Sequence, residues 1–172
     1  MCIMNGMTKE QSGLEEFFRR YPELSFKKND IIVEYAESTN YILYINRGEV
    51  RQVDITATGN ELTLNVLKTG AFISLPWVFK TDNSLFSFRA NNSVVVRKAP
   101  VADVKKFVEG NSEVSLEILK RVSRGLDGVL LRLGAHMGHQ AASSVRVELY
   151  LEAIRFGRPD KENKTTVSIL VN

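Results

Sequence analysis

The residue types that most often carry catalysis or bind metals are few in this chain of 172 residues. It has one cysteine, Cys2, and two histidines, His136 and His139. A single thiol forms no internal disulfide and holds no iron–sulfur cluster, and no cysteine or group of carboxylates lies near the histidines. We therefore expect no metal and no cofactor. The chain also has no nucleophile elbow, phosphate loop or metal motif, so we do not expect an enzyme.

Aromatic and apolar residues gather in the segment from residue 72 to residue 88. They are Phe72, Leu75, Trp77, Phe79, Phe86 and Phe88. Such a group can line an apolar pocket for a small effector molecule. It can equally fill the interior of a β domain, because Phe and Trp also dominate ordinary cores. The sequence leaves both alternatives open.

A second pattern lies after residue 112, where apolar residues are spaced by alternating steps of three and four. The members of this seam, with a histidine at its C-terminal end, are Leu119, Val122, Leu126, Val129, Leu133 and His136. This spacing predicts a helix over residues 112–139 whose seam pairs with the same helix of a second copy. His136 is either a pH-sensitive contact across that dimer or only a polar end to the seam.

The predicted helix also contains four glycines, at positions 125, 128, 134 and 138. Each costs about 1 kcal/mol relative to alanine inside a helix. We interpret them as positions where a neighbouring backbone approaches closely. The alternative is that the helix is merely weak or kinked.

Before residue 110, turn signals recur about every ten residues, from Asp30 to Asn92. Between them lie short strand candidates: Ile31–Tyr35, Tyr41–Asn46, Glu49–Thr56, Glu61–Leu67, Leu85–Phe88 and Ser93–Lys98. Strands this short and evenly spaced predict a compact all-β domain, such as a β-roll, barrel or jelly roll.

Three details of this β region are specific enough to test. The apolar residues of Glu61–Val66 occupy every second place, which predicts that they share one face of a sheet. Val50, Val53 and Ile55 are spaced less regularly, which predicts a bulge or a change of register. The glycines in Asn46–Glu49 and Thr58–Asn60 predict two hairpin turns.

Helices are predicted on both sides of the β region. A short helix over residues 12–20, capped by Ser12, has an apolar face that should lie against the β domain. Pro100 opens a second short helix that ends near Gly110. After the long helix, another is expected from residue 141 to Gly157, followed by a polar loop over 158–164 and a strand over 165–171. One helix and one strand bury no core of their own, so residues 140–172 are expected to begin a further domain.

Composition limits the class of function. The net charge is +3, with 14 Lys and Arg against 13 Asp and Glu up to residue 110, and 9 against 7 beyond it. Neither part has the strong basic field that would by itself indicate nucleic-acid binding. No apolar run approaches the roughly 18 residues that span a bilayer, and there is no signal-peptide core. We expect a cytoplasmic protein that makes no contact with a membrane.

The order of these elements resembles the Crp/Fnr superfamily of bacterial transcription regulators, whose sensor half is a β-roll of the cyclic-nucleotide-binding type. The resemblance extends from about residue 14 onward. It rests on the order and spacing of three motifs: Ile45–Val50, Lys68–Ile73 and Val145–Leu149. It implies a mainly β fold with helices, in which a double-stranded β-helix or jelly roll is followed by a long dimerisation helix. In this family the chain continues into a helix-turn-helix that binds DNA.

The resemblance also tests one ligand. Cyclic-nucleotide binders of the family carry a Phe-Gly-Glu-Leu-Ala-Leu motif and a later Arg, in which the Glu contacts the ribose and the Arg neutralises the phosphate. Here Ser74 stands at the Gly position and Leu75 at the Glu position, and Pro76 lacks an N–H donor. The Arg position falls on Ser84 or Leu85. A buried phosphate without a cation is costly, so we expect an effector other than cyclic AMP or cyclic GMP.

The resulting prediction has three segments: a sensor β-roll with short helices over residues 12–111, a dimerisation helix over 112–139, and the start of a winged helix-turn-helix over 140–172. The expected partners are a second copy, a small-molecule effector, and DNA through a C-terminal domain that this sequence does not include. The candidate ligand-binding residues are Phe72, Ser74, Leu75, Trp77, Ser84 and Arg89. The main alternative is an interaction module of the same fold that senses nothing. A cupin-type enzyme is a distant third, because both histidines lie outside the β region.

Overall fold

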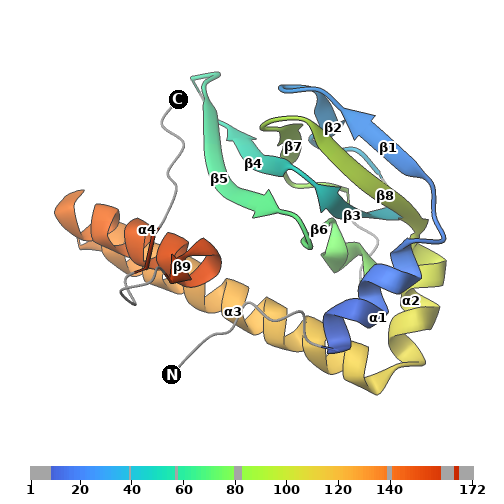
Figure 1. Ribbon diagram of the computed structural model, residues 1–172. Helices are drawn as coiled ribbons and strands as arrows, with labels where there is room; N and C mark the ends of the chain where they lie inside the picture. The colour runs from blue at the N-terminus through green and yellow to red at the C-terminus, as the bar shows by residue number, and fades with distance from the viewer. Residues whose placement is uncertain are drawn as a thin grey trace. The chain divides into compact units, whose positions relative to one another are not determined.

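The computed structural model describes residues 9–38, 40–56, 58–79, 83–138, 141–159 and 165–166. The chain divides into two compact units after Ser115. The first unit consists of two β-sheets and two short helices (Figure 1). The second consists of most of a long helix, a further helix and one pair of two-residue strands.

Two four-stranded sheets, antiparallel throughout, build the first unit (Figure 1). One has the order β1-β8-β3-β6, formed by β1 (Glu23–Phe26), β8 (Val94–Pro100), β3 (Tyr41–Arg47) and β6 (Phe72–Ile73). The other has the order β2-β7-β4-β5, formed by β2 (Ile31–Val33), β7 (Ser87–Ala90), β4 (Glu49–Ile55) and β5 (Glu61–Lys68). The predicted jelly-roll class is confirmed.

The core of the roll consists of aliphatic side chains that both sheets contribute. The fully buried members are Val33, Ile42, Leu43, Ile45, Val50, Val53, Ile73, Val94 and Val96. Burying one such side chain stabilises the fold by about 1.5–3 kcal/mol, so this set supplies most of what holds the sheets together.

The two predicted hairpin turns have different outcomes. β4 and β5 do form a hairpin, closed where Thr56 N–H donates to Asn60 O at 2.9 Å, with Gly59 at φ +81°. The turn containing Gly48 is not a hairpin, because β3 and β4 belong to different sheets. Gly48 has φ +97°, so the glycine signal was correct for a left-handed turn. It marks a corner where the chain crosses from one sheet to the other.

The predicted change of register in β4 is confirmed. The pairing of β4 with β5 shifts between Gln52 and Val53, and Leu64 of β5 is the extra residue. The same bulge interrupts the alternation predicted for β5, because Leu64 has no partner on β4. Leu62 is 51% exposed, whereas Leu64 and Val66 are half-buried, so the three apolar residues do not share one environment.

In the first unit, β1 and β6 were not predicted, and β7 begins two residues later than expected. β1 has mostly exposed residues and β6 has only two residues, so neither has a readable pattern. β7 begins at Ser87, whereas the prediction placed that strand from Leu85. Ser84 Oγ donates to Phe86 O at 2.6 Å, and this local turn delays the strand.

Two short helices, α1 (Lys9–Phe18) and α2 (Val101–Glu109), belong to the first unit. Because α1 begins before Ser12, the predicted cap at that residue is wrong. The predicted packing of α1 on the β domain is confirmed, since Phe18 is fully buried with its ring centroid 5.3 Å from that of Tyr44.

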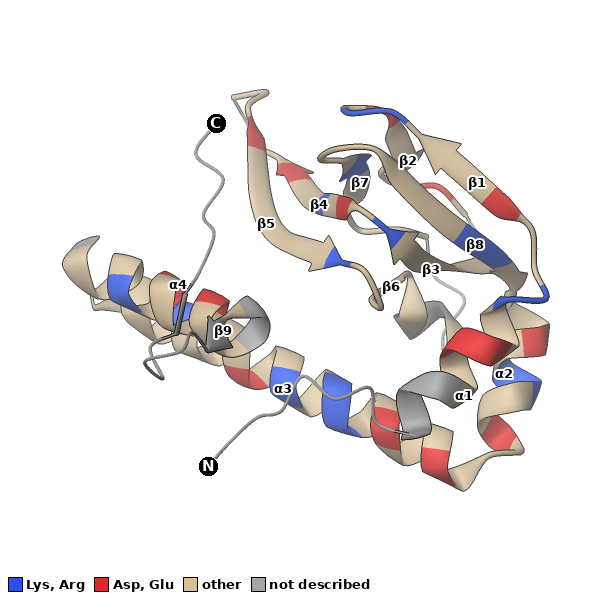
Figure 2. Cartoon of the chain, in the orientation of Figure 1, with Lys and Arg blue, Asp and Glu red and all other residues tan. Residues whose placement is uncertain are grey.

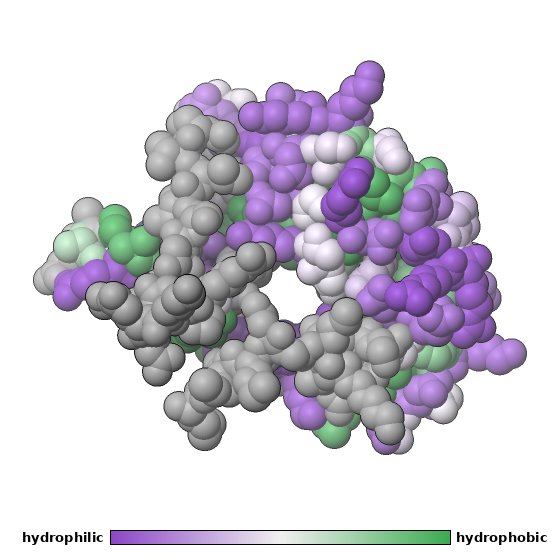
Figure 3. Space-filling model, viewed as in Figure 1, coloured by the Kyte–Doolittle hydropathy of each residue, from purple (hydrophilic) through white to green (hydrophobic). Residues whose placement is uncertain are grey.

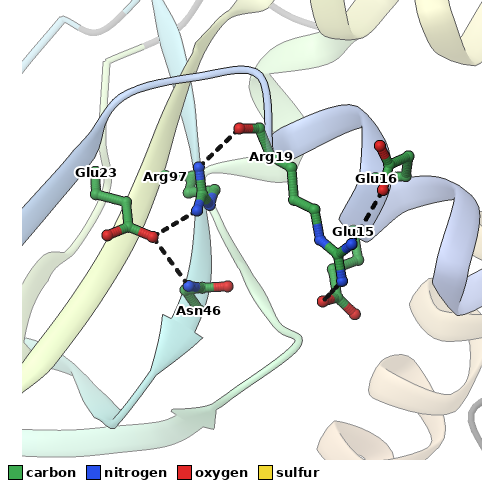
Figure 4. A network of polar contacts seen from close by, with 6 residues as sticks. All are labelled: Glu15, Glu16, Arg19, Glu23, Asn46 and Arg97. Carbon is green, nitrogen blue, oxygen red and sulfur yellow. Dashed lines mark hydrogen bonds and ion pairs between the residues drawn. The ribbon is translucent and has the colours of Figure 1, made fainter.

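Arg97 of β8 fastens the end of α1 to the roll (Figure 4). Its Nη1 donates to Arg19 O at 2.8 Å and Tyr21 O at 3.0 Å. Its Nη2 donates to Glu23 Oε1 at 2.5 Å, and Asn46 Nδ2 donates to the same oxygen at 3.2 Å. The two bonds of Nη1 satisfy carbonyl groups of the segment that directly follows α1.

The long helix α3 (Ser112–Met137) is followed by α4 (Ala141–Phe156), β9 (Arg158–Pro159) and β10 (Thr165–Thr166). β9 pairs with β10, so the start of the predicted loop over 158–164 is a strand instead. The last five residues of the strand predicted over 165–171 lie outside the described part of the chain. Of the helices described, none combines the length and the apolar character that a membrane crossing requires.

Candidate functional site

The first candidate site follows β6, where the sequence placed most of the ligand-binding residues. Ser74 comes directly after Phe72 and Ile73 and has φ +70°, the left-handed conformation that glycine adopts easily. Ser74 is only 8% exposed, and its Oγ has no hydrogen-bond partner among the described residues. A buried hydroxyl without a partner costs about 1–3 kcal/mol, so this residue combines backbone strain with an unmet polar group.

The next residues form a single turn of 3-10 helix, η1 (Leu75–Val78). Leu75 is half-buried and presents a hydrocarbon side chain where cyclic-nucleotide binders carry a carboxylate. Pro76 contributes no N–H to this turn. The side chain of Trp77 lies outside the described part of the structure.

Ser84 occupies the position expected for the phosphate-binding arginine, and its polar groups are hydrogen-bonded to the segment after β2 and to its own loop. Its N–H donates to Glu37 O at 3.0 Å, and its carbonyl accepts Ala36 N–H at 2.8 Å. Its Oγ donates to Phe86 O. The alternative position, Leu85, is 61% exposed and carries no charge. Neither position therefore offers a cation to a phosphate.

Arg89 is not brought together with the β6 segment. It lies on β7, whereas β6 belongs to the other sheet. It is directly opposite Arg51, so these two share a face, and Phe88 and Ala90 occupy the other face of β7. Arg89 Nε lies 2.7 Å from Glu61 Oε1 as an ion pair, without the angle of a hydrogen bond. This pairing already neutralises the guanidinium in part.

Phe72 packs against other aromatic rings. Its ring centroid lies 5.6 Å from that of Phe18 and 5.3 Å from that of Tyr44. Such tilted contacts between rings stabilise a core beyond the area they bury. For Phe72, of the two alternatives that the sequence left open, these contacts favour the core.

The second candidate site is the seam of α3, and its side chains are open to solvent. The aliphatic members are exposed by 53–60%: Leu119 60%, Val122 54%, Leu126 57%, Val129 56% and Leu133 53%. His136, the last member, is also exposed, and its Nδ1 lies 3.4 Å from Ser144 Oγ of α4. Apolar residues in a row on a single helix are the usual mark of an interaction surface.

The glycines of α3 meet different surroundings. A Cβ added at Gly128 would lie 3.8 Å from Leu151 Cδ2 of α4, whereas Gly125 and Gly134 have nothing within 4 Å. Gly138, just past the end of α3, meets only carbonyl oxygens of the last turn of that helix. Among the described residues, the one neighbour from outside α3 is therefore the side chain of Leu151.

Charged residues are dispersed across the described elements. Basic and acidic residues both occur along the strands and along α3 (Figure 2). The visible face over the strands is mostly hydrophilic, and hydrophobic residues show at the far end of α3 and α4, at the left (Figure 3). Among the described residues, no group of three or more His, Cys, Asp or Glu lies close enough to hold a metal ion.

Comparison with known families agrees with this geometry. The family described as the cyclic nucleotide-binding domain matches residues 23–111, a little more than half of the chain. The chain belongs to this family. The match runs from the start of β1 past the end of α2, and it includes Ser74, Ser84 and Arg89. No curated protein matches the chain significantly.

Solved structures of transcriptional regulators share the fold. A regulator from Thermotoga maritima has a TM-score of 0.62 at 17% identity, covering 70% of this chain and 94% of that one. The sensor domain of the regulator DNR from Pseudomonas aeruginosa has a TM-score of 0.56 at 18% identity, covering 67% and 77%. The catabolite activator protein of Thermus thermophilus has a TM-score of 0.62 at 15% identity, covering 76% and 60%. The predicted resemblance is confirmed at the level of family and fold.

Two features of these sites could not be found by motif matching. The left-handed backbone and the buried hydroxyl of Ser74 have no sequence signal except that this serine stands at the position of the glycine in the expected cyclic-nucleotide motif. The contact between Gly128 and Leu151 joins residues 23 positions apart, and only the glycine hinted at close approach.

Proposed function

We propose that this chain is the sensing and dimerising part of a Crp/Fnr-type DNA-binding transcription regulator. The observation that carries the proposal is the exposed seam of α3, on a helix that begins directly after the cyclic nucleotide-binding domain. The same helix of a second copy can pack along this seam, because the members of the seam repeat in steps of three and four. Pairing two copies would remove these half-exposed side chains from water.

The proposed effector is a small molecule other than cyclic AMP or cyclic GMP. Leu75, Pro76 and Ser84 replace the carboxylate, an N–H donor and the cation that a cyclic nucleotide phosphate and ribose require. The hydrogen bonds of Ser84 to Ala36, Glu37 and Phe86 leave it little freedom to turn toward a ligand. A phosphate buried here would lose its water without gaining a charge partner.

The proposed mechanism is a population shift. An effector would favour one of two arrangements of the paired α3 helices. A change in that pairing would then re-aim the DNA-binding domains that follow in proteins of this type. Regulation would thus need no new contact with DNA, because it would change only the spacing between the two DNA-binding domains of the dimer.

The second candidate is an interaction module of the same fold that binds no small molecule. The aromatic contacts of Phe72 with Phe18 and Tyr44 favour it, because they assign one predicted pocket residue to the core. The two candidates differ in whether the roll holds a small-molecule ligand or acts only through contacts with other proteins.

Two measurements on the full chain test the proposal. Sedimentation equilibrium at 1–200 micromolar is expected to show a dimer; a lone protomer throughout would contradict it. Thermal unfolding is then followed with cyclic AMP, with cyclic GMP and with a library of apolar metabolites. A ligand at a hundred times its Kd stabilises the folded state by about 2.7 kcal/mol, which such scans detect readily. We expect no response to either cyclic nucleotide and a response to a library member. If no member of the library changes the thermal unfolding, the second candidate is favoured.

A further inference from the structure

Helices α3 and α4 lie side by side and are joined by contacts between residues far apart in sequence (Figure 1). Arg132 Nε donates to Glu148 Oε1 at 2.7 Å, and the two side chains are 20% and 44% exposed. Leu151 is only 6% exposed and lies beside Gly128, with its Cδ2 3.8 Å from the place that a Cβ on the glycine would take. Gly128 and Arg132 are one turn apart on α3, so the two contacts stack along one side of the helix.

This side of α3 is not the seam. Gly128, Arg132 and Ala135 follow a helical stripe whose residues are half-buried. Leu126, Val129 and Leu133 are each more than half exposed. At 100° per residue the two stripes are separated by about a third of a turn. Docking of α4 therefore leaves the aliphatic part of the seam, from Leu119 to Leu133, free for a second copy, and only His136 at its end also lies near α4.

We propose that Gly128, Arg132, Glu148 and Leu151 form a latch that holds α4 against α3, and that its opening frees the segment beyond α4 to change direction. This regulatory role rests on the proposed function, in which residues 140–172, including α4, begin the DNA-binding domain. The latch itself depends only on contacts within the second unit. It places a second control point outside the β-roll, on a different helix face from the dimer seam.

The latch is built to be weak. It combines one partly exposed ion pair, which changes such an equilibrium only about two- to fivefold, with the burial of one leucine. His136 Nδ1 and Ser144 Oγ, 3.4 Å apart, add a long contact near the turn between the helices. An ion pair that remains partly exposed is screened by salt, so the open form should gain population as ionic strength rises.

Distances between two spin labels on the full chain test the latch directly. Cys2 is the only cysteine, so Cys2→Ser gives a background for labels at Asp127→Cys and Arg146→Cys, both exposed and outside latch and seam. Labelled chains are mixed with excess unlabelled chains, so that only distances within one chain are read. The wild-type latch is expected to give a dominant short distance.

Substitutions in the latch should redistribute this distance. Arg132→Gln and Glu148→Gln should each lower the ratio of short to long distances two- to fivefold, and the exchange R132E with E148R should recover part of it. Gly128→Leu should remove most of the short-distance population, because the new leucine side chain would occupy the space in which Leu151 packs. Arg124→Gln is the matched control, since Arg124 lies on α3 with its Nη2 3.7 Å from Glu117 and is expected to change nothing.

The outcomes separate the latch from the proposed function. A wild-type distribution without a short distance, or a Gly128→Leu variant that keeps it, overturns the latch whatever the oligomeric state. Sedimentation of the same samples tests the dimer independently. Latch variants that lose the short distance but stay dimeric support both proposals. A monomeric wild-type chain that shows the short distance supports the latch and contradicts the proposed dimer.

Discussion

Gly48 lies so close to Val94 that a Cβ built on the glycine would come within 2.9 Å of the valine Cα. The carbonyl oxygen of Ser93 would be closer still, and the φ of +97° is itself unfavourable for other residues. Gly48→Ala should therefore destabilise the fold by about 3 kcal/mol or more, since the obstructing atoms are backbone. Urea unfolding measures the change.

Gly59→Ala is the matched control for this prediction. Gly59 has a similar φ of +81°, but nothing lies within 4 Å of the Cβ it would gain. It should cost only the conformational strain, about 1–2 kcal/mol. Equal effects at the two glycines would show that steric closeness at the corner is not what matters.

Arg97→Gln should loosen α1 from the roll. The substitution removes bonds to Arg19 O, Tyr21 O and Glu23 Oε1, and leaves the two carbonyls short of a donor. We expect a loss of about 2 kcal/mol in the free energy of unfolding, together with faster hydrogen exchange in α1. Arg47→Gln, at an exposed arginine at the end of β3, should change neither quantity measurably. Equal losses in the two variants would argue against a role for these bonds.

The fold was readable from sequence where a pattern extended over many residues. The strands of the roll, α2 and α3 follow from repeated spacing of apolar residues. Elements without such repetition were not predicted, because β1 is an exposed edge strand and β6 has only two residues. The glycine at position 48 shows a further limit. A glycine in the left-handed backbone conformation indicates a turn. Whether that turn joins two paired strands depends on which sheet each strand belongs to.

The candidate sites divide in the same way. The seam of α3 was predictable because it repeats along one helix, and its exposure needs no tertiary contact. The surroundings of Ser74 were not predictable, since its φ and its unpartnered hydroxyl depend on how β6 meets the next turn. Arg89 was named from its closeness in sequence to the β6 segment, but alternation along β7 and the two-sheet topology set it apart.

Replacing Ser74 should stabilise the protein, which is unusual for a buried position. Ser74→Gly relieves the left-handed strain and removes the unpartnered hydroxyl. Ser74→Ala removes only the hydroxyl. We expect gains of about 2 and about 1 kcal/mol respectively, measured by thermal or urea unfolding. Destabilisation by both variants would mean that a water or ligand satisfies the hydroxyl in solution.

Leu126→Glu should break the dimer. The substitution replaces an exposed leucine at the middle of the seam, 57% exposed in one copy, with a charge that would face its equal in the partner. Loss of a central apolar contact together with repulsion should weaken association at least a hundredfold, as seen by sedimentation. Leu131→Glu is the matched control, because Leu131 is also an exposed leucine of α3 but lies off the seam. Dissociation by both variants would point to a general effect of charge on α3.

Tyr41 should make stability fall at alkaline pH. Burial, and then the hydrogen bond from its hydroxyl to Glu37 Oε1 at 2.8 Å, raise the pKa of Tyr41 well above its ordinary value of about 10. A raised pKa in the folded state means that the neutral phenol stabilises the fold below about pH 10. That contribution is lost as pH rises further, because the unfolded chain then releases a proton that the folded chain retains.

The comparison with Tyr41→Phe isolates this effect. Phenylalanine keeps the ring under Lys98, whose Nζ lies 3.8 Å from the ring centroid, so only the hydroxyl is removed. The stability advantage of wild type over Tyr41→Phe should be constant from pH 7 to 9 and shrink between about pH 10 and 12. Tyr35→Phe, at a tyrosine that is 61% exposed, should show no such change. A constant difference between wild type and Tyr41→Phe up to pH 12 would rule out the raised pKa, and with it a hydrogen bond to Glu37 that persists in solution.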